Sequence, residues 1–275
     1  MKVYNGSTFT MSNSSFLLNN ASGTTKNNGG GLYIECESQS VCHTEYTRFE
    51  QNTAGKHGSG IKTFARYMAT VVHLNLTAYN NTNTNGSAAL HTQLVGSNYD
   101  GSFLDIRDNT AYVASGMSIT SDDNDTVSNA NLTYSYFDNN VGQVSGSASM
   151  EGSPGRYCIL HNEFRNGAAL SGASGGVTFY QFKTGGSVLV ESNIFVNNSG
   201  GIGSGIAIFF NSVGNIELNY NCFENCTSPD AGLLGTSTYI YTDNSEATLS
   251  AVDNAVYGGG VAFEVKRYLA IPGTR

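Results

Sequence analysis

The residues best suited to chemistry are the acidic side chains concentrated between positions 100 and 125. Asp105 and Asp108 flank Arg107 in this stretch. Two carboxylates that converge on one groove are the machinery of glycoside hydrolysis, and an arginine beside acidic groups would suit a polysaccharide lyase. These three residues are therefore the catalytic candidates of an enzymatic hypothesis. The favoured interpretation is a surface ion pair between Arg107 and one of the aspartates, which contributes little to stability.

A second acidic group, Asp122, Asp123 and Asp125, forms a short loop in the same stretch. Calcium prefers carboxylate and carbonyl oxygens, so this loop is the candidate metal site, and calcium is the one cofactor that the sequence suggests. The spacing is not that of a dedicated calcium loop. The favoured interpretation is a solvated turn, with no cofactor bound.

The histidines show no shared spacing that would indicate a common site. His57, in Gly55-Lys-His-Gly-Ser-Gly60, superficially resembles the Gly-His-Gly element of polygalacturonases. In that family the histidine follows the paired aspartates, whereas here it precedes every aspartate, so we expect a surface histidine in a turn. The remaining histidines fall singly along the chain, at His43, His73, His91 and His161.

Five cysteines leave at least one thiol unpaired. Cys36 with Cys42 and Cys222 with Cys226 are close enough in sequence to form local disulfides in an oxidising compartment. Zinc is the alternative for Cys222-x-x-x-Cys226, but no second ligand pair at zinc spacing accompanies it. Disulfides are therefore the preferred prediction, and Cys158 is expected to stay free.

N-glycosylation sequons are more numerous than chance predicts for this composition, which favours an exported, extracellular or cell-surface glycoprotein. They begin at Asn5, Asn13, Asn20, Asn75, Asn80, Asn85, Asn124, Asn131, Asn197 and Asn225.

The composition favours one folded domain over residues 1–275, either a whole protein or a segment of a longer surface protein. Of the 275 residues 39% are hydrophobic and 12% charged, and the chain contains 33 glycines and three prolines. The net charge of −8 argues against nucleic acid as a partner, because phosphate binding requires clustered lysine and arginine. The apolar runs are too short to predict a membrane span.

A degenerate repeat sets the expected fold: an aromatic residue, an asparagine three positions later, and then a glycine-led apolar strand. Its best copies are Phe16-x-x-Asn19, Phe49-x-x-Asn52, Phe137-x-x-Asn140 and Phe195-x-x-Asn198. Looser copies start at Tyr79, Ile106, Phe164, Phe223 and about Ala251. The intervals between copies are irregular, but the order of features within each copy is kept. This combination is typical of a solenoid whose turns vary in length.

Each repeat contains two strands with alternating apolar residues. Before the anchor the predicted inward pairs are Phe9 and Met11, Val72 and Leu74, Val188 and Val190, and Ile216 and Leu218. This phase points His73 outward. The asparagines suit tight left-handed corners and can hydrogen-bond their counterparts in the next coil as an internal ladder. We therefore predict an all-β, right-handed parallel β-helix of about nine coils.

The Phe-x-x-Asn anchors followed by Gly-Gly-apolar steps, clearest from Phe16 to Leu32 and Phe195 to Ile206, resemble the repeat of the polymorphic membrane proteins. These belong to the pectin-lyase-like superfamily of right-handed parallel β-helices. The resemblance implies display at a cell surface, often for adhesion.

Two classes of function remain open. The favoured hypothesis is an extracellular structural or adhesive glycoprotein, not an enzyme, whose coils stack on other copies or adjoining solenoid segments as a filament and which contacts glycans or a host surface. The alternative is a polysaccharide-binding module, lyase or hydrolase that uses the groove beside the strands. Tyrosines suited to stacking on sugars support the alternative, at Tyr134, Tyr136, Tyr180, Tyr239 and Tyr241.

Overall fold

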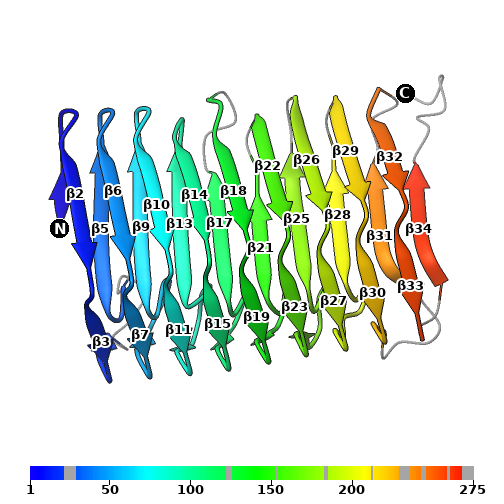
Figure 1. Cartoon of the computed structure of the whole chain (residues 1–275), viewed down its shortest axis with the longest axis horizontal. Helices are drawn as coiled ribbons and strands as arrows, with labels where there is room; N and C mark the ends of the chain where they lie inside the picture. Colours follow the sequence, from blue (N-terminus) through cyan, green and yellow to red (C-terminus); the bar gives the residue numbers. More distant parts are fainter. Residues whose placement is uncertain are drawn as a thin grey trace, which may run out of the picture.

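The computed structural model describes residues 1–21, 29–121, 126–152, 154–182, 185–211, 213–228, 236–242, 246–258 and 261–267. Strands β1 to β34, joined by turns and loops, make up the regular structure of this described part, and no helix occurs in it. The strands lie side by side along one long axis, from β2 and β3 at the N-terminal end to β32, β33 and β34 at the C-terminal end (Figure 1). The prediction of an all-β chain is confirmed.

Two long sheets form the wider faces of the molecule. Sheet A contains, in order, β1 (Lys2–Val3), β5 (Leu32–Glu37), β9 (Ile61–Arg66), β13 (Leu90–Val95), β17 (Met117–Ser121), β21 (Ala148–Glu151), β25 (Val177–Phe182), β28 (Ile206–Phe210), β31 (Thr236–Thr242) and β34 (Val261–Arg267). Sheet B contains β2 (Thr8–Ser12), β6 (Val41–Glu45), β10 (Thr70–Leu74), β14 (Asn98–Ser102), β18 (Asn129–Thr133), β22 (Gly155–Leu160), β26 (Gly186–Glu191), β29 (Gly214–Asn219) and β32 (Thr248–Val252).

Two narrower sheets close the cross-section. Sheet C contains β3 (Ser15–Leu17), β7 (Arg48–Glu50), β11 (Thr77–Tyr79), β15 (Asp105–Arg107), β19 (Tyr136–Asp138), β23 (Glu163–Arg165), β27 (Ile194–Val196), β30 (Cys222–Glu224) and β33 (Ala255–Tyr257). Sheet D contains β4 (Asn20–Ala21), β8 (Thr53–Ala54), β12 (Thr82–Asn83), β16 (Thr110–Ala111), β20 (Val141–Gly142) and β24 (Ala168–Ala169).

Strands of successive turns pair in parallel and in register. In sheet B, for example, Val71 of β10 lies between Cys42 of β6 and Tyr99 of β14. The nine strands of sheet B therefore mark eight full turns of a parallel β-solenoid, close to the predicted nine coils. The right hand of the coil stays a prediction.

A column of aromatic rings fills the interior along sheet C. Phe137, Phe164, Phe195 and Phe223 are fully buried, and consecutive rings stack with centroids 4.8 to 5.0 Å apart. Burying each such ring contributes about 1.5–3 kcal/mol. Two predicted anchors were misplaced, because the register puts Ala78, not Tyr79, and Val256, not Ala251, in this column.

The predicted asparagine ladder is confirmed at the corner between sheets C and D. Asn52, Asn81, Asn109 and Asn140 are fully buried, and the first three each donate both the backbone N–H and the side-chain Nδ2 to Oδ1 of the next asparagine. Each Nδ2 also donates to a main-chain carbonyl of the preceding turn, as Asn81 does to Phe49 at 3.0 Å. The amides thus satisfy corner backbone groups that would otherwise be buried without partners.

A second ladder, which sequence analysis missed, stands at the corner between sheets B and C. Asn162, Asn193 and Asn221 donate in the same way to Oδ1 of the next member, and the ladder ends at Asn254. Ser135 joins it from the preceding turn, because its N–H donates to Asn162 Oδ1 at 2.8 Å. The two ladders overlap in the middle of the molecule, so every part of the described solenoid has at least one.

The left-handed backbone predicted for the ladder asparagines was wrong by one position, because the residue before each ladder position adopts it instead. Along the sheet C–D corner these residues include Asn80, Asp108, Asn139 and Asn197, types that tolerate positive φ. Along the B–C corner several are aromatic instead, and Phe103, Tyr134 and His161 stack on one another with centroids 5.5 and 5.0 Å apart. An exposed aromatic column therefore runs along this edge.

One predicted pair of inward residues was wrong by one position. Val71 and His73 point into the solenoid, whereas Val72 and Leu74 lie on the outer face of β10. His73 is 1% exposed, and its Nδ1 lies 3.3 Å from the hydroxyl of Tyr99. The inward positions of this strand were misassigned because Val71, Val72 and Leu74 are all apolar, so the sequence fits an inward Val71 as well as an inward Val72. The hydrogen bond to Tyr99 allows His73 to be buried.

Candidate functional site: a polar cleft on sheet A

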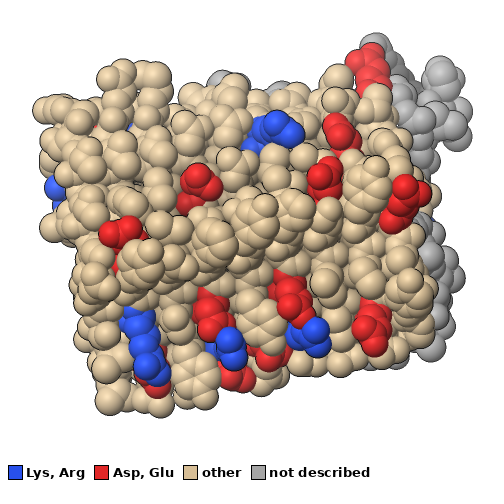
Figure 2. Space-filling model, viewed as in Figure 1, with Lys and Arg blue, Asp and Glu red and all other residues tan. Residues whose placement is uncertain are grey.

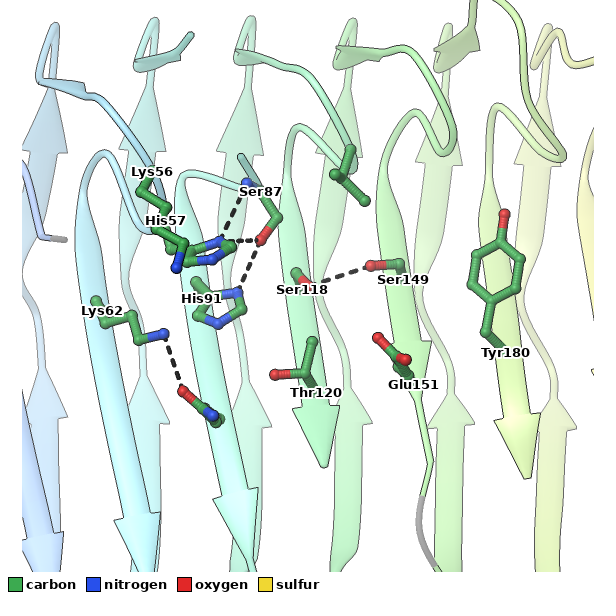
Figure 3. A pocket seen from close by; sticks show the side chains of 12 residues that line it. Lys56, His57, Lys62, Ser87, His91, Ser118, Thr120, Ser149, Glu151 and Tyr180 are labelled. Carbon is green, nitrogen blue, oxygen red and sulfur yellow. Dashed lines mark hydrogen bonds between the residues drawn. The ribbon is translucent and has the colours of Figure 1, made fainter. Parts of the chain in front are cut away.

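A cleft of about 400 Å³ lies on the outer face of sheet A. Its floor comes from five neighbouring strands, β9, β13, β17, β21 and β25, whose outward side chains form two rows in register. One row is Lys62, His91, Ser118 and Ser149, and the other is Gln93, Thr120, Glu151 and Tyr180. The cleft therefore runs along the solenoid axis, across the strands (Figure 3).

The loops between sheets D and A form one wall of this cleft. They contribute Lys56, His57, Ser87 and Val113, and they cover the first floor row so closely that Lys62 and His91 are 5% and 2% exposed. Gly86 allows this packing. A Cβ at this position would lie 1.3 Å from the carbonyl oxygen of Lys56, so only glycine fits where the two loops cross.

Two histidines from successive turns meet at the N-terminal end of the cleft. The rings of His57 and His91 stack with centroids 4.6 Å apart, and the hydroxyl of Ser87 lies 2.9 Å from Nδ1 of each. The Ser87 backbone N–H also points at His57 Nδ1, at 3.4 Å. All contacts are satisfied when Ser87 Oγ donates to His57 Nδ1 and His91 Nδ1–H donates to Ser87 Oγ. In this arrangement His91 Nε2 is an acceptor and His57 Nε2–H a donor.

Both histidines are neutral at physiological pH. Burial, with the nearby charges of Lys62 and Lys56, lowers the pKa of His57 to about 4. Burial, Lys62, His57 and Lys56 together hold the pKa of His91 well below its ordinary value. Fixed positive charge at this end thus comes from the two lysines, while the histidines supply neutral donors and acceptors.

The rest of the cleft offers hydroxyl, amide and carboxylate groups. Lys62 Nζ donates to Gln93 Oε1 at 3.1 Å, and Ser149 Oγ donates to Ser118 Oγ at 3.2 Å (Figure 3). Glu151 lies toward the far end, where burial and this carboxylate raise the pKa of Tyr180 to about 12. The cleft is therefore basic at one end, acidic at the other, and rich in uncharged hydrogen-bonding groups between them.

An aromatic run continues the same face of sheet A beyond the cleft. The rings of Tyr180 and Phe209 stack with centroids 5.3 Å apart, and Tyr239 follows at 5.8 Å from Phe209. Lys266 Nζ lies 5.8 Å from the centroid of Tyr239. Polar floor and aromatic run together occupy one side of the solenoid over successive turns.

The residues of the enzymatic hypothesis lie elsewhere, on sheet C. Arg107 forms an ion pair with Asp105 on the same strand, β15, and packs against the ring of Tyr136 at 4.8 Å. Asp108 stands at the corner and accepts a hydrogen bond from Asn139 at 2.6 Å. Similar pairs recur along this face, and Figure 2 shows basic and acidic side chains next to one another over the strands of sheet C. These residues form a surface row of ion pairs and do not line the sheet A cleft.

The calcium candidates Asp122, Asp123 and Asp125 lie outside the described residues. Within the described ranges, no group of three or more histidine, cysteine, aspartate or glutamate side chains is placed to hold a metal ion.

Cys36 and Cys42 form a disulfide between β5 and β6. The other predicted pair was wrong, because Cys222 and Cys226 are both free thiols. Cys222 is half-buried on the outer face of β30, whereas Cys226 is fully buried at the ladder corner, where its thiol contacts the carbonyl of Phe195. The corner between them points the two side chains in different directions. Cys158 is free and 3% exposed.

Nine of the ten sequon asparagines are described, and none of the nine is buried. Asn13, Asn75, Asn80, Asn197 and Asn225 occupy left-handed corners, and Asn5 has the same backbone in the turn after β1. Asn20 lies in β4, Asn85 in a loop beside the cleft and Asn131 on the outer face of β18; Asn124 lies outside the described residues. No sequon asparagine falls within a described strand of sheet A.

Sequence analysis missed the cleft because His57 and His91 do not occupy equivalent positions in their repeats. The strand partner of His91 in the preceding turn is Lys62, not His57. The available signal was the recurrence of polar residues at outward positions of the glycine-led strands. Comparison with known proteins finds no match among family models, curated proteins or solved structures. The described part of the chain contains no helical segment with the length and hydropathy of a membrane span.

Proposed function

We propose that this chain is an extracellular or cell-surface solenoid that binds an extended glycan along the outer face of sheet A. The observation that carries the proposal is the continuity of the polar cleft with the partly exposed rings of Tyr180 and Phe209 on one face. Sugar recognition combines hydrogen bonds to hydroxyl groups with contacts to aromatic rings, and this face offers both.

The direction of the cleft favours a long ligand. Successive turns of the solenoid are spaced by about 4.8 Å, so a floor built from five strands presents equivalent positions over about 19 Å. A chain molecule lying along the axis would meet a new pair of outward side chains at each turn. A compact ligand would use only part of this surface.

Binding fits the cleft better than hydrolysis. Glycoside hydrolysis requires two carboxyl groups on either side of one bond. Among the described residues that line the cleft, Glu151 is the one carboxylate, and Asp105 and Asp108 belong to another face. We therefore propose an adhesive or structural glycan-binding role without catalysis.

Display outside the cell is supported by several independent features. The Cys36–Cys42 disulfide suits an oxidising compartment, and the described sequon asparagines are accessible to a glycosyltransferase. The resemblance to the polymorphic membrane protein repeat points to a surface β-helix. No sequon asparagine falls within a described strand of sheet A, which forms the floor of the cleft, although Asn85 lies in a loop beside it.

The proposal is tested by titrating the purified chain with a panel of neutral and acidic oligosaccharides long enough to span the cleft. Lys62→Met and Thr120→Val keep side-chain volume but remove hydrogen-bonding groups from the floor. We expect each to weaken the dissociation constant about tenfold, the equivalent of about 1.4 kcal/mol. Arg107→Met on sheet C is the matched control and should leave affinity unchanged. Equal effects of all three variants, or no binding by the wild-type chain, would reject the proposal.

A further inference from the structure

The first turn of the solenoid exposes an unpaired edge. Strands β2 and β3 pair on one side only, with β6 and β7. Their inward side chains, Phe9, Met11 and Phe16, are half-buried, although they belong to columns that are otherwise sealed: Phe49, next to Phe16, is 0% exposed. Within the described residues, this end therefore presents apolar side chains and free strand edges together.

The last turn exposes the other edge of the parallel sheets. Among the strands that the structure describes, β32 and β33 pair only with β29 and β30. Leu249 is 41% exposed and lines an apolar cavity of about 230 Å³ with Ile216, Ile240 and Ala247. Both ends of the described solenoid thus combine unpaired strands with accessible apolar surface.

The two ends match each other in register. The residue columns of sheets B and C run unbroken through the molecule, and they assign Phe9 and Leu249 to one column, Met11 and Ala251 to a second, and Phe16 and Val256 to a third. If the last turn of one copy met the first turn of another, each large side chain would face a smaller one. Such size alternation across facing positions is what a well-packed interior requires.

The asparagine ladder supplies a second, polar match. Asn254 ends the ladder at the B–C corner, and its backbone N–H has no acceptor among the described residues. The equivalent residue of the first turn is Ser14, whose Oγ donates to the carbonyl of Ser12 at 3.0 Å. Ser135, in the same column, makes the same i−2 bond and also accepts the N–H of Leu104 from the preceding turn. Ser14 Oγ has the geometry to accept from Asn254 in that way.

We propose that copies of this chain associate head to tail, with β32 and β33 of one copy pairing in parallel with β2 and β3 of the next. The contact joins different surfaces and does not close on itself, so it generates a linear filament. The match is weakest at sheet A, where Lys2 would lie beside Lys266, but each lysine already pairs with a glutamate, Glu35 and Glu264. The inference rests on the ends alone and does not depend on glycan binding.

Light scattering over a concentration series of the purified chain, with electron microscopy of the same samples, tests the proposal. We expect the wild-type mass to rise with concentration and short filaments to appear. Phe9→Glu should block one end and Leu249→Lys the other, so that each variant alone stays monomeric. Mixed in equal amounts, the two variants should form a dimer and nothing larger, because one open end of each kind remains.

A milder pair of variants separates association from folding. Ser14→Ala removes the predicted acceptor and should weaken self-association about fivefold to tenfold, whereas Thr10→Ala, at an exposed position of β2, should not. Circular dichroism should show unchanged secondary structure in both. A wild-type chain that stays monomeric at the highest concentration, in which case other partners occupy the ends, would overturn the proposal. So would a wild-type assembly that stops at a dimer.

Discussion

The imidazole rings of His57 and His91 stack 4.6 Å apart although they belong to different turns of the solenoid, and Ser87 of the intervening loop bridges their Nδ1 atoms. The loop wall and the strand floor of the cleft are thus joined through two neutral histidines. Protonating either ring would place a positive charge beside Lys56 and Lys62. The cleft should therefore be sensitive to acid.

Stability should fall as the pH is lowered from about 6.5 toward 4. The pKa of His57 is lowered to about 4 and that of the core residue His73 to about 3, chiefly by burial, whereas the unfolded chain takes up these protons near pH 6.5. Since the unfolded state binds more protons in this window, each histidine contributes a slope of about 1.4 kcal/mol per pH unit. Urea unfolding at several pH values measures it.

The variant His57→Gln should flatten that slope by the contribution of one histidine while leaving the response of His73 in place. A wild-type free energy of unfolding that does not change between pH 6.5 and 4 would contradict the prediction.

Replacing Gly86 should open the cleft without destroying the solenoid. In Gly86→Ala the new Cβ meets the carbonyl of Lys56, so the loop must move away from its neighbour, at a cost of about 1–3 kcal/mol. Hydrogen exchange should then accelerate at Ser87, whose N–H donates to Lys56 O at 3.1 Å. Asn85→Ala, in the same loop but exposed, serves as the control and should behave as wild type. Unchanged exchange in Gly86→Ala would show that the loop tolerates the added atom.

The buried ladder should contribute far more than surface asparagines of the same type. Asn81 accepts from Asn52 and donates from Nδ2 to Phe49 O and Asn109 Oδ1, so Asn81→Ala leaves several buried groups without partners. We expect a loss of about 2–4 kcal/mol in the free energy of unfolding. Asn131→Ala, on the exposed face of β18, should change it by less than about 0.5 kcal/mol. Similar losses for both variants would argue against a structural ladder.

Peptide mapping without reductant should recover Cys36 joined to Cys42 and leave Cys158, Cys222 and Cys226 to alkylation after unfolding. Because the disulfide closes only a short loop, its removal by Cys36→Ser with Cys42→Ser should cost about 2 kcal/mol. A peptide joining Cys222 to Cys226 would contradict the structure.

The repeat pattern was enough to predict the fold because each copy specifies the structure of its own turn. Phe49 with Asn52 and Phe195 with Asn198 specify an inward ring and a corner amide, whatever their neighbours are. Prediction of the inward residues failed where apolar side chains fall on both faces of a strand, as at Val71 to Leu74. The second ladder was missed where it begins with a serine instead of an asparagine. The cleft was out of reach because it depends on loops crossing between turns: sequence spacing does not reveal that His57 folds over the strand that holds Lys62.

The two overlapping ladders have a mechanical consequence. Strands lie across the long axis, and the first and last turns stand at opposite ends, so tension between the ends would load the hydrogen bonds of successive turns in series (Figure 1). Each turn contacts only its neighbours, so it would yield as a separate unit. Turns held by a ladder at both corners, near the middle, should give way last. Such a molecule would lengthen in steps under load. Its central turns would stay folded longest and would serve as the template on which the other turns refold.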